Sequence, residues 1–151
     1  MIIQQITRTD ADKVFINIDN GEGATLPSGA AVIWHTGTDA NGLLIRQPDT
    51  AKLFGFIGCL DASIASVTGS YGLVQCFGYK SNAIVFQTDT SIPAGVELIA
   101  VAGQNYLQSV VTTTASNAAV TQQPIRAILA ASVASSTASA TISVGVYIQA
   151  M

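Results

Sequence analysis

The chain has 151 residues, of which 49% are hydrophobic and only 10% are charged, whereas soluble domains carry roughly 25% charged residues. This length fits one domain, or two very small ones, and it supports a core without a metal, disulfide or cofactor. Six Lys and Arg against nine Asp and Glu give a net charge of −3. Because the basic residues are also scattered along the chain, nucleic-acid binding is not expected.

In chain order, residues 1–12 are expected to be a short N-terminal arm or a first strand. Segments rich in β-branched and aromatic residues then predict strands at residues 13–18, 30–34, 43–46, 83–87, 96–101, 106–111 and 141–148. Asn41-Gly42 favours a turn that pairs the second strand with the third. Residues 61–70 and 130–140 are rich in Ala, Ser and Thr, which is compatible with either a short helix or a loop.

An internal repeat organises the rest of the chain. The sequence TLPSGAAVI at residues 25–33 is echoed by SIPAGVELI at residues 91–99. Pro followed two residues later by Gly favours a turn that leads into a strand. We therefore expect two similar β units, residues 25–79 and 91–148, in one domain of residues 13–151. The predicted fold is all-β, a compact antiparallel β-barrel or β-sandwich.

Residues 71–79, with the sequence YGLVQCFGY, form a distinctive strand. One face carries Tyr71, Leu73, Phe77 and Tyr79, and the other carries Gly72, Val74, Cys76 and Gly78. Glycines in a strand permit close approach of a neighbouring backbone. We therefore expect a central strand with packed aromatic residues on one side and a close layer on the other.

The second half of the chain is poor in charge. Two uncharged stretches, residues 98–125 and 127–151, are long enough to cross a bilayer. Their many hydroxyl and amide side chains argue against lipid-facing helices, so no membrane partner is expected. Because a freely dissolved surface normally carries more charge, we expect other subunits to cover this half. The interface candidates are Leu107, Val110, Val111, Ile125, Ile128 and Leu129.

No catalytic, cofactor-binding or metal site is expected. Cys59, Cys76 and the single His35 have neither the spacing nor the number of ligands for structural zinc. The cysteines lie in apolar runs where free thiols pack well. The sequence alone does not exclude a disulfide between them. His35 most simply ends a strand, and no nucleophile motif accompanies it. The N-terminus lacks the pattern of a secretory signal, which favours synthesis in a reducing cytosol.

Four motifs carry a resemblance. The segments ATLPSG at residues 24–29, FGFIG at 54–58, YGLVQCFGY at 71–79 and IPAG at 92–95 resemble the head decoration, or cement, proteins of tailed bacteriophages. The resemblance implies a compact β domain, often trimeric, on the outside of the capsid at local threefold positions. It supplies no catalytic residues, so the protein is not expected to be an enzyme.

Two hypotheses for function follow. The first is a structural virion protein, made in the host cytoplasm, that binds the major capsid protein of an assembled head as a homotrimer and stabilises the shell. Ile2, Ile3 and Ile6 could then form an arm that adds a strand to a neighbouring sheet, or simply belong to the first strand of the chain's own sheet. The alternative is a phage tail or spike domain that binds carbohydrate through Trp34, Tyr106 and Tyr147.

Overall fold

The computed structural model describes residues 12–35, 42–49, 55–66, 69–87, 91–110, 127–135 and 139–150. These residues form nine strands and no α-helix, which confirms the all-β prediction. The strands are β1 (Val14–Asn20), β2 (Ala31–Trp34), β3 (Leu44–Arg46), β4 (Phe56–Leu60), β5 (Tyr71–Gln87), β6 (Glu97–Ala100), β7 (Leu107–Ser109), β8 (Ala127–Leu129) and β9 (Ala140–Gln149).

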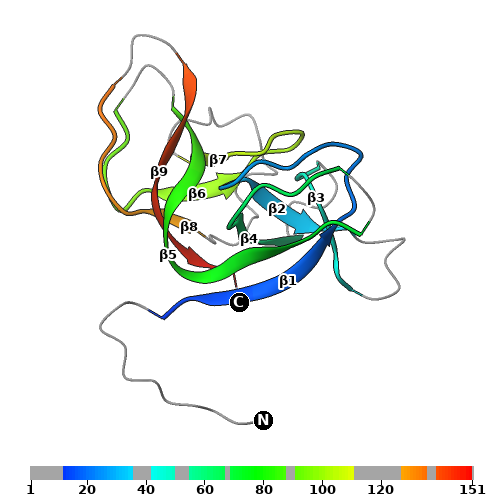
Figure 1. The fold of residues 1–151 in the computed structure, drawn as a ribbon. Coiled ribbons are helices and arrows are strands. Elements are labelled where there is room, and N and C mark those ends of the chain that lie inside the picture. Colours follow the sequence, from blue (N-terminus) through cyan, green and yellow to red (C-terminus); the bar gives the residue numbers. More distant parts are fainter. Residues whose placement is uncertain are drawn as a thin grey trace.

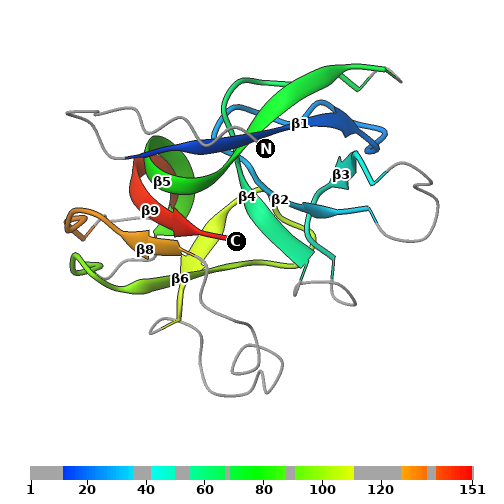
Figure 2. The same ribbon diagram turned by 90° about the horizontal axis from the view of Figure 1, so that it is seen from below.

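The strands close into two five-stranded rings that share β5 (Figure 1). The first ring runs β1-β3-β2-β4-β5 and is closed by the pairing of β1 with β5. The second runs β5-β7-β6-β8-β9 and is closed by the pairing of β5 with β9. In Figure 2, β2 and β3 lie on one side of the molecule and β8 and β9 on the other, while β5 spans both. The fold is thus a closed β-barrel with a second ring of strands built on it.

Both rings have the same pattern of strand pairing. β1 pairs with β3 in parallel, as β5 does with β7, and every other pairing is antiparallel. The two parallel pairings depart from the expected antiparallel fold. An isolated bridge stands at the same place in each ring, Leu26 with Ile64 and Ile92 with Val133. The residues described within 61–70 and 130–139 are therefore bridged loops without helix, and Ala140 already begins β9.

The repeated Pro-x-Gly turns lie at corresponding positions of the two rings. Gly29 and Gly95 both have a positive φ, 78° and 82°, a conformation that glycine adopts at no steric cost. The Gly29 N–H donates to the Leu60 carbonyl at 2.9 Å, and the Gly95 N–H donates to the Leu129 carbonyl at 2.8 Å. Each turn is thus hydrogen-bonded to the strand that pairs with the strand after the turn, which is β4 for β2 and β8 for β6.

The core consists of two hydrophobic clusters separated by β2. Alternate residues of β2 point to opposite sides, so that Val32 joins one cluster while Ala31 and Ile33 join the other. The cluster that contains Val32 fills the first ring. The cluster that contains Ala31 and Ile33 fills the second ring and packs against the outer side of β2 and β4. Because β2 is buried on both faces, the two rings form a single packed unit.

The strand predicted at residues 71–79 continues without a break through residues 83–87 as β5. Gly78, with φ 92°, lies where a side chain would collide with backbone, since a Cβ there would lie 2.2 Å from the Asp12 carbonyl oxygen. The side-chain amide of Gln75 donates to the carbonyls of Phe77 at 3.1 Å and Tyr79 at 3.0 Å. The ribbon of β5 is curved in Figure 1, and this one strand is a wall of both rings.

Candidate binding surface

The outer side of β1, β5 and β9 carries large apolar side chains that are open to solvent. Their exposed fractions are 38% for Phe15, 62% for Tyr71, 45% for Leu73, 39% for Phe77 and 48% for Tyr147. We call these five residues the aromatic face. They are the side chains that a strand places on the outside when its alternate residues fill the core, as Val74 and Ile148 do.

Strand register brings these residues together. Leu73 lies opposite Asn17, next to Phe15 on β1. Phe77 pairs with Val14 of β1 on one side and with Gln149 of β9 on the other, which links the two parts of the face. Tyr147 lies opposite Tyr79, and their rings are tilted by 54° with centroids 5.4 Å apart. The five side chains of the face are uncharged.

The position of these aromatic residues corrects one expectation. Tyr71, Leu73 and Phe77 were expected to pack in the interior, yet they are exposed, and the opposite side of the strand is the buried one. The close layer on that opposite side is present, because a Cβ at Gly72 would lie 2.4 Å from Cδ1 of Ile64. The sequence of β1 did indicate an exposed side of this sheet. Phe15 and Asn17 alternate with Ile16 and Ile18, and a residue that alternates with core positions faces outward.

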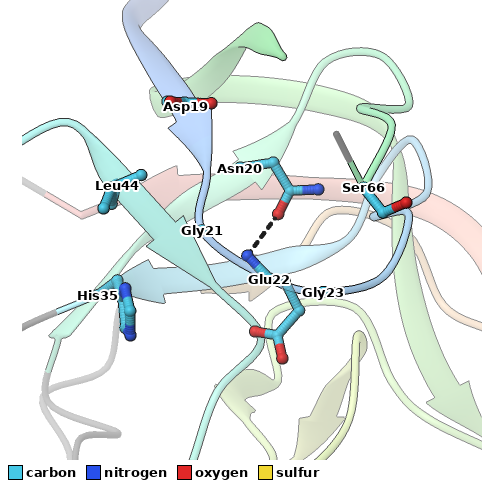
Figure 3. A pocket seen from close by; sticks show the side chains of 8 residues that line it. All are labelled: Asp19, Asn20, Gly21, Glu22, Gly23, His35, Leu44 and Ser66. Carbon is cyan, nitrogen blue, oxygen red and sulfur yellow. Dashed lines mark hydrogen bonds between the residues drawn. The ribbon is translucent and has the colours of Figure 1, made fainter. Parts of the chain in front are cut away.

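A polar pocket of about 310 Å³ lies at the turn after β1 (Figure 3). It is lined by Asp19, Asn20, Gly21, Glu22, Gly23, His35, Leu44 and Ser66. Asn20 accepts a hydrogen bond from the Glu22 N–H at 2.9 Å and donates to the Ala65 carbonyl at 2.8 Å. Glu22 accepts from the Gln47 N–H at 3.1 Å. These hydrogen bonds hold the turn against two neighbouring segments.

The histidine and the serine that line the pocket lie apart from each other. His35 and Ser66 lie on opposite sides of the turn in Figure 3. His35 follows β2 directly, and its backbone N–H donates to the Leu44 carbonyl at 2.9 Å. Within the described part of the chain, no three His, Cys, Asp or Glu residues are grouped so as to hold a metal ion.

The two cysteines are free thiols inside the molecule. Burial raises the pKa of the Cys59 thiol from 9.0 to about 12, partly offset by the positive charge of Lys80. Burial also raises the pKa of Cys76. Because the thiolate is the reactive form, neither cysteine is suited to act as a nucleophile.

The predicted subunit-interface residues occupy different environments. Leu107 on β7 and Leu129 on β8 are buried in the chain's own core, so they are not available to a partner. In strands this short, the periodicity of apolar residues could not distinguish core positions from interface positions. Val110 and Ile128 are half-buried. Val111 and Ile125 lie outside the described residues, as do Ile2, Ile3 and Ile6 of the predicted arm.

The aromatic residues considered for carbohydrate binding do not share one environment. Trp34 is half-buried against the cluster of the first ring. Tyr106 stacks on Phe86, with ring centroids 5.0 Å apart and planes 21° apart. Tyr147 is the exposed member of the three.

Comparison of the chain with protein-family models and with curated proteins found no match. Among the described residues, no helix has the length and apolar character needed to span a bilayer.

Proposed function

We propose that the protein is a capsid decoration protein, which binds the outside of an assembled phage head at local threefold sites and stabilises it. The observation that carries this proposal is the aromatic face, a set of exposed apolar side chains on the outer side of β1, β5 and β9. The four sequence motifs that resemble head decoration proteins support it, and the major capsid protein is the proposed partner.

The size of the aromatic face favours a macromolecular partner. A fully buried aromatic side chain covers roughly 150–250 Å², so the five partly exposed side chains leave on the order of 500 Å² open. Contiguous apolar patches of about 300–600 Å² are the largest found on typical monomers and are often functional. A standard interface buries about 800 Å² per partner, so the face with its polar rim would suffice for one such contact.

Stabilisation then follows from mass action. A ligand that binds the assembled shell but not its separated subunits lowers the free energy of the assembled state. A homotrimer at a threefold site contacts several capsid subunits at once, so modest individual contacts give high avidity. In this proposal Ile2, Ile3 and Ile6 belong to an arm that reaches a neighbouring subunit, and the protein is located on the outer surface of the virion.

Carbohydrate binding is the less favoured function. It needs exposed aromatic rings that together form a platform, whereas Trp34 packs against the core and Tyr106 stacks on Phe86.

Co-sedimentation with purified, undecorated heads tests the proposal. The wild-type protein is expected to pellet with heads, and the double variant Tyr71→Ser/Leu73→Ser is expected to bind at least about tenfold more weakly, because it removes two exposed contact side chains. Thr141→Ala, an exposed polar change elsewhere on β9, is the matched control and should bind like wild type. A wild-type protein that stays in the supernatant, or a double variant that pellets equally well, overturns the proposal.

A further inference from the structure

Gly145 in β9 leaves room for the ring of a tyrosine on the neighbouring strand. A Cβ atom at position 145 would lie 2.5 Å from the Oη atom of Tyr79, 2.9 Å from its Cε2 atom and 3.0 Å from its Cζ atom. These three atoms form the hydroxyl end of the Tyr79 side chain. An added methyl group that overlaps a neighbour forces that neighbour to move. The Tyr79 ring can therefore keep its place only while residue 145 is glycine.

The backbone of Gly145 does not itself require glycine. Gly29 and Gly78 have a positive φ, whereas Gly145 does not, so an alanine could adopt the same backbone conformation. Glycine inside a strand also loses more conformational freedom on folding than any other residue, and it often marks a place where another group approaches closely. The close approach of Tyr79 is therefore the structural reason for glycine at this position.

The Tyr79 ring also packs beside Tyr147, the member of the aromatic face that lies on β9. The two tyrosines are opposite each other in the register of β5 and β9. Their ring centroids are 5.4 Å apart and their planes are tilted by 54°, which is a favourable arrangement of aromatic rings. Residues two apart in a strand point to the same side, so positions 145 and 147 share the side on which Tyr79 lies. The Tyr79 ring is thus packed against both.

This packing orders the ring of Tyr147 before any partner is bound. The exposed fraction of Tyr147 is 48%, while Tyr79 is partly buried. A side chain whose orientation is already fixed loses less rotamer freedom when a partner covers it, so more of its contact energy appears as affinity. Tyrosine is also enriched among the residues that dominate binding energy at protein interfaces. An ordered tyrosine on the aromatic face is therefore suited to anchor the contact.

We propose that Gly145 is a positioning residue of the aromatic face. By admitting the Tyr79 ring, it fixes the orientation of Tyr147, and the two tyrosines together contact the capsid on the β9 side of the face. The inference rests on the proposed function, and it adds Tyr79 to the five residues that define the face. Gly145 acts through these two rings and needs no contact of its own with the capsid.

Nuclear magnetic resonance of the purified protein tests the geometry without heads. In the wild type, nuclear Overhauser contacts should join the Tyr79 ring with the Gly145 Hα protons and with the Tyr147 ring. In Gly145→Ala the contact between the two rings should be lost, because the new methyl group displaces Tyr79. Gly23→Ala is the matched control, since no atom lies within 4 Å of a Cβ there, and it should keep the contact. Rings that stay in contact in Gly145→Ala overturn the proposal.

Co-sedimentation with undecorated heads tests the effect on binding. Gly145→Ala should raise the dissociation constant at least about tenfold, because it displaces the ordered anchor, and Gly23→Ala should bind like wild type. The double variant Gly145→Ala/Tyr79→Phe lacks the Oη atom that lies closest to the new methyl group. It should therefore bind at least about threefold more tightly than Gly145→Ala. Circular dichroism checks that each variant is folded. A double variant that binds no better than Gly145→Ala overturns the proposal.

The outcomes separate this inference from the proposed function. A wild-type protein that does not bind heads rejects the proposed function and this inference with it. A glycine with a merely structural role would instead lower the stability of Gly145→Ala while the folded variant keeps its affinity for heads. Wild-type binding together with equal binding by Gly145→Ala therefore rejects the positioning role alone.

Discussion

At the scale of the residue, burial decides what each polar or reactive side chain does. Lys80 lies almost wholly inside the molecule, and its ammonium group donates to the half-exposed Asp61 carboxylate at 2.7 Å. Cys59 is fully buried near this charge. Asn20 lies buried after β1 and its hydrogen bonds join two loops. These are structural roles, which fits the prediction that the cysteines pack as small hydrophobic groups.

The Cys59 thiol predicts a pH dependence of stability. Its pKa in the folded chain is about 12, above the ordinary 9.0, so between about pH 9 and pH 12 the unfolded chain releases this proton while the folded chain keeps it. The free energy of unfolding should therefore fall as pH rises through this window, by up to about 1.4 kcal/mol per pH unit from this group. Below pH 9 the contribution is constant.

Urea unfolding of wild type and Cys59→Ala at a series of pH values measures this effect. The wild type should lose more stability than the variant between pH 9 and pH 11, although the variant starts lower because of its cavity. Other titrating groups cancel in the difference between the two proteins. Parallel pH profiles would show that Cys59 is not responsible.

At the scale of the element, most strands could be predicted, but their extents and exposed faces could not. The strands at residues 30–34 and 43–46 are present as β2 and β3 and pair as expected. β4 and β8 were not among the predicted strands, although residues 56–60 and 127–129 are apolar. The continuity of β5 was missed, because Ser81 and Asn82 are poor strand formers and only pairing with β9 on both sides of them keeps the strand together.

The two Pro-x-Gly turns offer a matched pair of substitutions. Gly29→Ala and Gly95→Ala introduce the same strain at nearly the same positive φ, but their surroundings differ. A Cβ at Gly29 would lie 2.0 Å from the Asn82 carbonyl oxygen, whereas no atom lies within 4 Å of a Cβ at Gly95. We expect Gly95→Ala to cost about 1 kcal/mol and Gly29→Ala clearly more, about 3 kcal/mol. Denaturant unfolding measures both, and equal losses would contradict the steric argument.

At the scale of the whole molecule, the shared strand makes the two rings interdependent. β5 supplies a wall to each ring, and Ile33 of the first ring packs in the same cluster as Leu98 of the second. Neither ring can lose its structure without exposing apolar surface of the other, which is the condition for cooperative unfolding.

We therefore expect a single unfolding transition. Fluorescence of Trp34, the one tryptophan of the sequence, reports on the first ring, and amide hydrogen exchange of β6 and β8 reports on the second. Both probes should give the same free energy of unfolding in denaturant, and Ile33→Ala should lower both by about 2–5 kcal/mol. Protection in β6 and β8 that survives the loss of the Trp34 signal would contradict this coupling.

The sequence by itself determined the all-β class, the turn positions and the repeat at residues 25–33 and 91–99, because these depend on local propensities and on which residues tolerate a positive φ. Only the tertiary structure decided which apolar residues are core. Leu107 is buried and Tyr71 is exposed, yet both lie in short apolar segments of similar composition. What separates them is the closure of two rings around one shared strand, and closure depends on pairings between residues far apart in the chain.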